Sequence, residues 1–224
     1  MKKFAALSIT AILIIVGFFA TDIVSQQKND LTNAFNTSIA LEKEGKLKDA
    51  ISVLEPFVEA NKTNYLLNLR LGYLYYSDTA WAKSVSHYDA ALKAKPNSVE
   101  ALLGLRLPYF AQQQYAKTEE IYNRIIKIDP NNKEANLRLG QIYYYKGLPK
   151  FEQGFAKAKP DWDKSKAYLD KVLSMYPSDY EANLAYGYTM YALGFNDKAR
   201  EAFNTVLMIS AKDSLALKGL GLIK

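Results

Sequence analysis

A pattern of 34 residues recurs along the chain and limits its possible folds more than any other feature. In the clearest copy, Tyr65 to Ser98, apolar or small residues stand at positions 7, 8, 11, 20, 24 and 27, and proline stands at position 32. The first three positions share one face of a helix, and the next three share one face of a second helix. Gly72 at position 8 lets two helix backbones approach closely, and Pro96 at position 32 ends the second helix.

Further copies precede and follow this one. Their bounds are Leu31–Asn64, Val99–Asn132, Lys133–Asp179 and Tyr180–Asp213, and a sixth copy starts in the terminal segment Ser214–Lys224. Three residues depart from the pattern: Arg106 stands at the small position 8, and Lys62 and Ala211 replace the proline. The fourth copy is longer, because Trp162 follows Tyr143 by 19 residues where Trp81 follows Tyr75 by 6, a difference of 13.

This pattern resembles the tetratricopeptide repeat (TPR), a helix–turn–helix unit of 34 residues. The resemblance covers the chain from about Leu31 onward. It implies an all-α fold, a right-handed α-solenoid of about five helix–turn–helix repeats plus a C-terminal helix, preceded by an N-terminal hydrophobic helix. One unit cannot bury its own apolar face, so the units are expected to stack and to form a concave inner surface.

The same positions predict helices that alternate with short turns. They are expected at 31–44, 47–61, 65–77, 81–94, 99–112, 115–128, 133–146, 162–175, 180–193, 196–210 and 214–223. Pro108 falls inside one of them, where its ring meets the carbonyl group of Gly104 and one helical hydrogen bond is lost. We therefore expect a kink between Gly104 and Pro108.

The N-terminal segment 1–25 has the composition of a signal peptide or a signal anchor. A basic start at 1–3 precedes an uncharged run of 17 residues, 4–20, which is long for a signal-peptide core and just long enough to span a bilayer. No pair of small residues marks a good cleavage site, so we favour an uncleaved anchor with its lysines in the cytoplasm and the repeats exported. Cleavage would instead leave a soluble periplasmic protein. Residues 26–30 are predicted to form a linker.

The insertion of the fourth copy, 146–161, combines lysines with aromatic rings. Phe151 and Phe155 are four residues apart and would share a helical face. With Lys150 and Lys157 they are candidates for docking a partner. The insertion is either a protruding basic, aromatic docking element or an extension of the two flanking helices that packs on its own array.

Composition argues against several functional classes. The net charge of +6 is mildly basic and spread out, with no stripe of Lys and Arg, so we expect no nucleic-acid partner. The absence of cysteine excludes disulfides and thiolate metal sites. His87 is the single histidine, and no metal-ligand pair, phosphate loop or nucleophile–base arrangement accompanies it. We expect no catalytic residue, no metal and no cofactor.

In each first helix, positions 2, 5, 6, 9, 12 and 13 lie opposite the packing face and would line the concave groove that the resemblance implies. The candidate groove residues are Arg70, Tyr73, Tyr76, Leu107, Phe110, Arg138, Gln141, Tyr144, Tyr145, Tyr188 and Tyr191. A helix that is apolar all round is normally buried all round, so adjacent helices could cover these rings. Alternatively, the rings are exposed and bind an extended peptide or a partner helix.

These features predict a non-enzymatic protein–protein interaction scaffold or adaptor in the bacterial cell envelope. Its partner would be another envelope protein, and the N-terminal segment would contact the membrane. Glycan or peptidoglycan binding, or a holdase role in the periplasm, is the alternative. The terminal helix 214–224 carries four leucines and looks incompletely capped. We expect it to fold over the core; the alternative is a contact with a partner or with a second copy of the chain, that is, self-association at the C-terminal edge.

Overall fold

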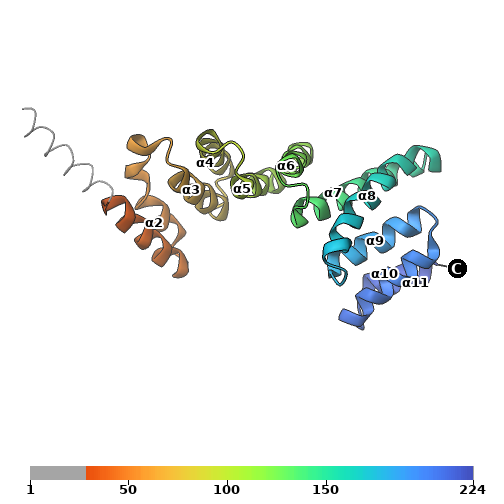
Figure 1. The fold of residues 1–224 in the computed structure, drawn as a ribbon. Helices are drawn as coiled ribbons and strands as arrows, with labels where there is room; N and C mark the ends of the chain where they lie inside the picture. Colours follow the sequence, from red (N-terminus) through yellow and green to blue (C-terminus); the bar gives the residue numbers. More distant parts are fainter. Residues whose placement is uncertain (1–28, 224) are drawn as a thin grey trace, which may run out of the picture. The chain divides into compact units, whose positions relative to one another are not determined.

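The computed structural model describes residues 29–223, which form helices joined by short turns and contain no strand (Figure 1). The predicted leader lies outside this range, while residues 29 and 30 of the predicted linker already belong to a helix that covers 29–43. The elements that follow are α2 (Leu47–Ser52), the 3-10 turns η1 (Glu55–Phe57) and η2 (Glu59–Asn61), α3 (Tyr65–Ser77), α4 (Trp81–Ala94), α5 (Val99–Ala111), α6 (Tyr115–Ile128), α7 (Lys133–Phe151), α8 (Phe155–Met175), α9 (Tyr180–Ala192), α10 (Asn196–Ile209) and α11 (Ser214–Leu222).

The chain divides into two compact units between Pro96 and Asn97. In the first unit, the helix at 29–43, α2, α3 and α4 enclose a core that includes Leu54, Leu67 and Leu71. The second unit contains α5 to α11, and one of its core clusters surrounds Trp162 and Phe203. Within each unit, consecutive helices pack in pairs, as the repeated pattern predicts.

Side-chain caps fix the starts of α3, α5, α7, α9 and α11. One residue accepts a hydrogen bond from the amide three positions later, which satisfies a helix N–H group that has no partner within the helix. The capping residues and their donors are Asn64 with Leu67, Ser98 with Ala101, Asn132 with Ala135, Asp179 with Ala182, and Asp213 with Ala216. These caps stand at the last residue of each predicted copy, so the repeat of the sequence is also a repeat of helix starts.

Buried asparagines at position 4 join the turns to the helices that follow. The Asn136 side chain donates to the carbonyl groups of Pro130 at 3.0 Å and Asn132 at 2.8 Å. Asn68 and Asn183 make the same pair of bonds in their own copies. Each amide thereby satisfies two turn carbonyls, which fixes the turn between one copy and the next.

Position 8 brings the paired helices into close contact, as expected. A Cβ atom on Gly72 would lie 2.9 Å from the Tyr88 ring, and one on Gly140 would lie 2.6 Å from Leu169. Arg106 at the same position cannot allow such an approach. Its guanidinium instead lies 5.8 Å from the centre of the Tyr122 ring, a cation–π arrangement in place of the close backbone contact.

One predicted helix is wrong in its second half. The helix expected at 47–61 ends at Ser52 and is followed by η1 and η2. Pro56 explains the break, because it has no N–H group and its ring would meet the carbonyl group of Ser52 in a continuous helix. By contrast, α5 continues through Pro108, and the kink at Gly104–Pro108 stays a prediction.

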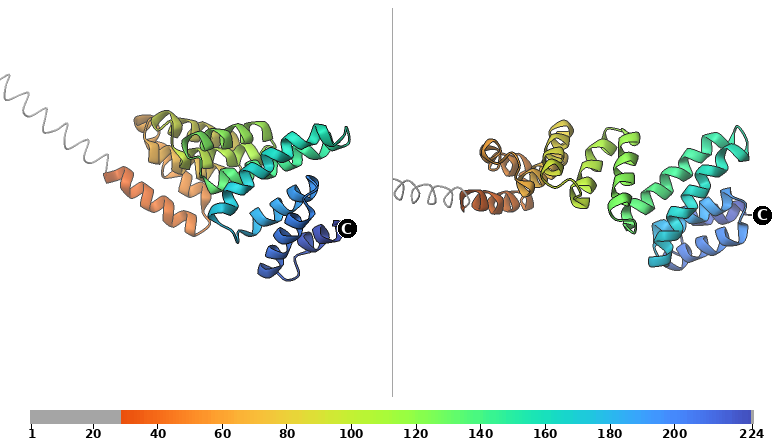
Figure 2. Two further views of the ribbon diagram at one scale, coloured as in Figure 1. Left: turned by 45° about the vertical axis from the view of Figure 1, so that its right-hand side comes forward. Right: turned by 45° about the horizontal axis from the view of Figure 1, so that its top comes forward.

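The insertion forms helix rather than a loop. α7 has 19 residues and α8 has 21, whereas the other helices of the pairs α3–α4, α5–α6 and α9–α10 have 13 or 14. Both turned views in Figure 2 show the end of the α7–α8 hairpin standing clear of α9 and α10. The two flanking helices are therefore extended, as one of the two interpretations predicted. None of the helices within 29–223 has the length and apolarity needed to cross a bilayer.

Candidate functional site

The predicted groove residues lie on α3 in the first unit and on α5, α7 and α9 in the second. None is fully buried. Tyr73, Phe110 and Tyr145 are the most exposed, at 41%, 59% and 67%. The others are half-buried: Arg70, Tyr76, Leu107, Arg138, Gln141, Tyr144, Tyr188 and Tyr191. The neighbouring helices therefore cover some of these rings and leave others exposed, and binding of a partner by the exposed rings stays a prediction.

In the first unit, Arg70 joins α3 to the helix at 29–43. It donates from Nη2 to the carbonyl oxygen of Ser38 at 3.0 Å and forms an ion pair with Glu42. Glu42 stands at position 12, where later copies carry an aromatic ring. In this copy the carboxylate at position 12 neutralises Arg70. With its donors committed to its own fold, Arg70 is poorly suited to bind a partner's carboxylate, while the exposed Tyr73 ring stays accessible.

In the second unit, a chain of ion pairs crosses three first helices. Arg106 on α5 lies 3.2 Å from Glu134 on α7, and Arg138 on α7 lies 3.2 Å from Glu134 and 2.7 Å from Glu181 on α9. Arg138 also donates to Gln141 at 3.0 Å. The arginines beside the rings thus already have acidic partners, which orient Arg138 and Gln141 along the surface of α7.

Tyr144 and Tyr145 of α7 and Tyr188 of α9 form one cluster, in which some rings are half-buried and one is exposed. Tyr144 lies 6.2 Å from Tyr188 and 5.3 Å from Tyr145, measured between ring centres. Burial, with three neighbouring tyrosines, raises the pKa of Tyr144 to about 12. Tyr188 packs on Phe203 and donates its hydroxyl to the carbonyl group of Leu215 at 2.7 Å. Tyr144 and Tyr188 therefore support the fold, and Tyr145 offers its ring to solvent.

We define the α7 face as Glu134, Arg138, Gln141 and Tyr145, which follow one another on one side of the helix at steps of four, three and four residues. A hollow of about 550 Å³ lies beside its first half. Leu103 of α5, Leu137 of α7 and Glu181 of α9 line this hollow with the start of the α7 face. These lining residues occupy positions 2, 5 and 6 of three successive copies, where the groove was predicted.

The insertion candidates lie beyond this face, at the end of the hairpin. Phe151 and Phe155 are exposed by 53% and 42%, and their ring centres lie 5.4 Å and 6.1 Å from that of Trp162. Lys150 forms an ion pair with Asp161, and Lys157 is exposed. The structure therefore places both Phe151 and Phe155 against Trp162, outside the hollow.

Three exposed residues were missed as candidates. Leu66 on α3 stands at position 2, a groove position that the sequence pattern already marked. Tyr115 starts α6, and the turn after α5 brings its ring centre to 5.8 Å from that of Phe110. Leu148 continues the apolar stripe of Tyr144 by one helical turn. Only Leu66 could have been found from the repeat pattern. The placement of Tyr115 depends on the turn after α5, and that of Leu148 on the insertion being helical.

Comparison with known proteins agrees with this arrangement of caps, turns and paired helices. Two models of the tetratricopeptide repeat match residues 35–99 and 156–222. This chain is a TPR protein. No curated protein matches it. The TPR fold generally mediates interactions between proteins, and its members are typically non-enzymatic scaffolds.

Solved structures share the TPR fold at low sequence identity. YrrB, described as a TPR protein with an unusual peptide-binding site, is 17% identical, with a TM-score of 0.66 over 88% of this chain and 95% of its own. MamA is 19% identical, with a TM-score of 0.66 over 84% of this chain and 95% of its own. A TPR protein from Parabacteroides merdae is 18% identical, with a TM-score of 0.66 over 87% and 72%.

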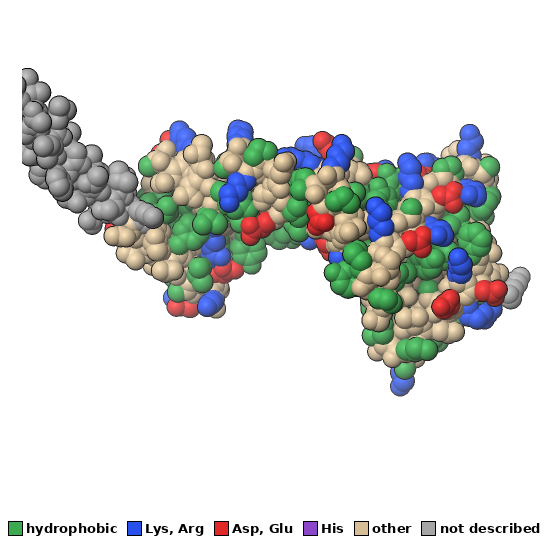
Figure 3. Space-filling view, in the orientation of Figure 1, with side chains coloured by type: hydrophobic (Ala, Val, Ile, Leu, Met, Phe, Trp, Pro, Cys, Tyr) green, Lys and Arg blue, Asp and Glu red, His purple; other side chains and the backbone are tan. Residues whose placement is uncertain are grey.

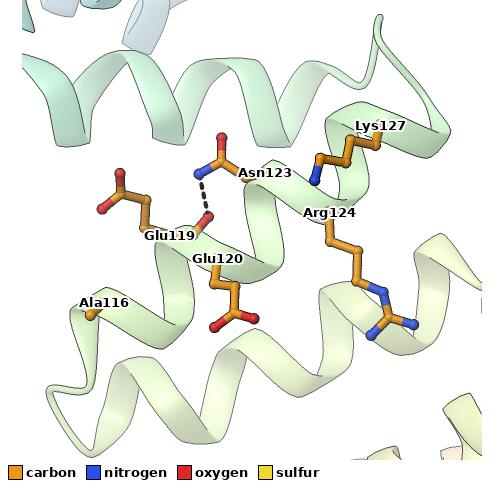
Figure 4. A pocket seen from close by; sticks show the side chains of 6 residues that line it. All are labelled: Ala116, Glu119, Glu120, Asn123, Arg124 and Lys127. Carbon is orange, nitrogen blue, oxygen red and sulfur yellow. Dashed lines mark hydrogen bonds between the residues drawn. The ribbon is translucent and has the colours of Figure 1, made fainter.

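A second hollow, of about 420 Å³, is a poor candidate for a binding site in this TPR protein. Figure 4 shows the six side chains that line it, Ala116, Glu119, Glu120, Asn123, Arg124 and Lys127, all on α6. Asn123 donates to the carbonyl group of Glu119, a bond within the same helix. Charges of both signs on one helix, without a ring or a facing wall, offer little apolar surface to bury.

The contacts of the single histidine, His87, join α4 to α3. The His87 ring stacks on Tyr75 at 5.3 Å, and Nδ1 lies 3.0 Å from Oδ1 of Asn68. Both N–H groups of Asn68 are used by turn carbonyls, so its oxygen accepts and His87 donates. Within residues 29–223 no group of three or more His, Asp or Glu side chains could hold a metal ion.

Proposed function

We propose that this TPR protein is a non-enzymatic scaffold that binds a peptide or helix of another cell-envelope protein on the α7 face. The observation that carries the proposal is the hollow at positions 2, 5 and 6, which lies beside the first half of the α7 face, while the exposed Tyr145 ring ends the second half. Such a surface combines apolar walls with oriented polar groups, the mixture that peptide-binding grooves use. The peptide-binding site described for YrrB supports this use of the fold.

The polar groups suggest the character of the bound segment. Arg138 already contacts Glu134, Glu181 and Gln141, so an incoming carboxylate would have to compete for it. A segment that places an apolar side chain against the half-buried Leu103, and a ring or proline beside Tyr145, gains burial without breaking these bonds.

The proposed location rests on the sequence of residues 1–25. The basic start and the uncharged run at 4–20 favour a single anchor in the cytoplasmic membrane, with the repeats on the periplasmic side. Cleavage of this segment would leave the scaffold soluble in the periplasm. The mass of the mature protein distinguishes the two forms.

Photo-crosslinking in the native envelope tests the binding proposal. A photoreactive amino acid replaces Tyr145, and a matched control replaces Met208, which is 86% exposed on α10. One dominant protein product from position 145 that position 208 does not give is the expected result. Many different proteins would indicate a holdase and glycan strands a glycan-binding protein, and either outcome, or no product, would overturn the proposal.

A further inference from the structure

The end of the α7–α8 hairpin stands clear of α9 and α10 in both views of Figure 2. Residues 148–157, which we call the hairpin tip, are exposed without interruption, and no other exposed run within 29–223 is as long. When successive residues on every side of two helix ends are exposed, the surface is convex. A convex tip has no walls to enclose a peptide, so it needs a different kind of partner from the hollow beside α7.

The hairpin tip exposes large apolar side chains on a rigid base. Leu148, Phe151 and Phe155 are each more than two-fifths exposed. Phe151 and Phe155 rest on Trp162, which is itself 2% exposed and donates from Nε1 to the carbonyl group of Tyr144 at 3.2 Å. Because Trp162 is fixed in the core, the two phenylalanine rings are held at the surface and cannot collapse inward.

Basic side chains surround these rings. Between residues 146 and 164 there are five lysines and three acids, a balance of five minus three, or +2. Lys150 is paired with Asp161 and Lys159 with Asp163, while Lys157 stays exposed. Figure 3 shows hydrophobic side chains interspersed with charged side chains of both signs in the region of α7 and α8. Lysine stems are long enough to lie along an apolar surface while their ammonium groups reach a charged layer above it.

We propose that the hairpin tip inserts into the interfacial layer of an anionic lipid bilayer. Phe151, Phe155 and Leu148 would enter the boundary between headgroups and acyl chains, and the lysines would contact lipid phosphates. Aromatic and aliphatic side chains combined with Lys are typical of surfaces that lie in this layer, and the negative surface potential attracts the basic groups. The convex shape and the charge favour a bilayer over a peptide at this place.

The absence of cysteine allows a site-specific test in the full-length protein. Gln153→Cys in the hairpin tip and Met208→Cys on α10 are each labelled with an environment-sensitive fluorophore. Each protein is mixed with vesicles of phosphatidylcholine alone or with phosphatidylglycerol added. Any tethering by residues 1–25 acts equally on both proteins, so the difference between the two probes isolates insertion of the tip.

The tip probe should shift to the blue, and brominated acyl chains should quench it, when phosphatidylglycerol is present, with less effect in phosphatidylcholine alone or in high salt. The control probe should not respond. Phe151→Ser with Phe155→Ser should remove most of the shift, whereas Phe151→Trp should retain it. Circular dichroism confirms folding, which these exposed positions should not alter.

Two results would overturn this inference. In the first, the tip probe and the control probe respond alike to anionic vesicles. In the second, the double serine variant keeps the full shift. A protein crosslink from position 153 in the native envelope, without quenching by lipid, would assign the tip to a protein partner. None of these results depends on the product caught from Tyr145, so the two proposals can fail separately.

Discussion

Replacing Gly147 by alanine tests whether the insertion is a packed part of the second unit. A Cβ atom at this position would lie 2.2 Å from Nε1 of Trp162 and 2.6 Å from its Cδ1 atom. Ordinary contacts between such atoms are about 3.5 Å or longer, so the ring or the α7 backbone must move by about 1 Å or more. The hydrogen bond from Trp162 to the carbonyl group of Tyr144 would be lost in that movement.

The expected cost follows from three contributions. Overpacking of a dense core costs about 1–3 kcal/mol, and loss of a hydrogen bond costs about 1 kcal/mol. Replacing a helical glycine by alanine stabilises the helix by about 0.5–1 kcal/mol, because the unfolded chain loses conformational freedom. The free energy of unfolding should therefore decrease by about 1–3 kcal/mol. Gly221→Ala is the matched control, because no atom lies within 4 Å of its added Cβ and its effect should be near zero or stabilising.

Urea unfolding followed by circular dichroism measures both variants. Tryptophan emission in a Trp81→Phe background reports on Trp162, the other tryptophan, and should shift to the red in Gly147→Ala. In a Trp162→Ala background, Gly147→Ala should no longer destabilise, which gives a coupling of about 1–3 kcal/mol. Equal stability of Gly147→Ala and Gly221→Ala would refute the packing of Trp162 against α7.

Two further predictions concern a titration and a helix cap. Burial lowers the pKa of His87 below its usual 6.5, so the unfolded chain takes up this proton more readily. The free energy of unfolding should fall between about pH 7 and pH 5, and His87→Gln should reduce that fall in urea titrations at the two pH values. Asp179→Ala should lower the thermal midpoint and cost about 0.5–2 kcal/mol. Asp179→Asn, which keeps the cap and loses only the ion pair with Lys133, should cost less; equal losses would show that the cap contributes little.

Much of the fold could be predicted from spacing alone. Gly72 with Tyr88 and Gly140 with Leu169 confirm that a small residue at position 8 meets the side chain at position 24. Each pair lies within a single copy of the repeat, and helix geometry determines which residues of that copy share a face. Pro56 was the local signal that was overlooked, and it is the reason that α2 ends early.

The candidate site was less predictable. Position 12 marks Tyr144 and position 13 marks Tyr145, but only the second ring is well exposed, because α9 places Tyr188 against the first. Arg70 looked available for a partner until the structure paired it with Glu42, 28 residues away. Such contacts join different copies of the repeat, and the pattern within one copy does not contain them.

The sequence by itself determined where helices start, which of their faces pack and how the copies repeat, because caps and prolines act within a few residues of themselves and the small residues at position 8 act within their own copy. Only the tertiary structure decided which rings stay exposed, which charges are already paired and that the insertion lengthens two helices into a hairpin. The physical reason is that burial depends on what the neighbouring helix places against a side chain, and that neighbour lies one or more copies away in the sequence.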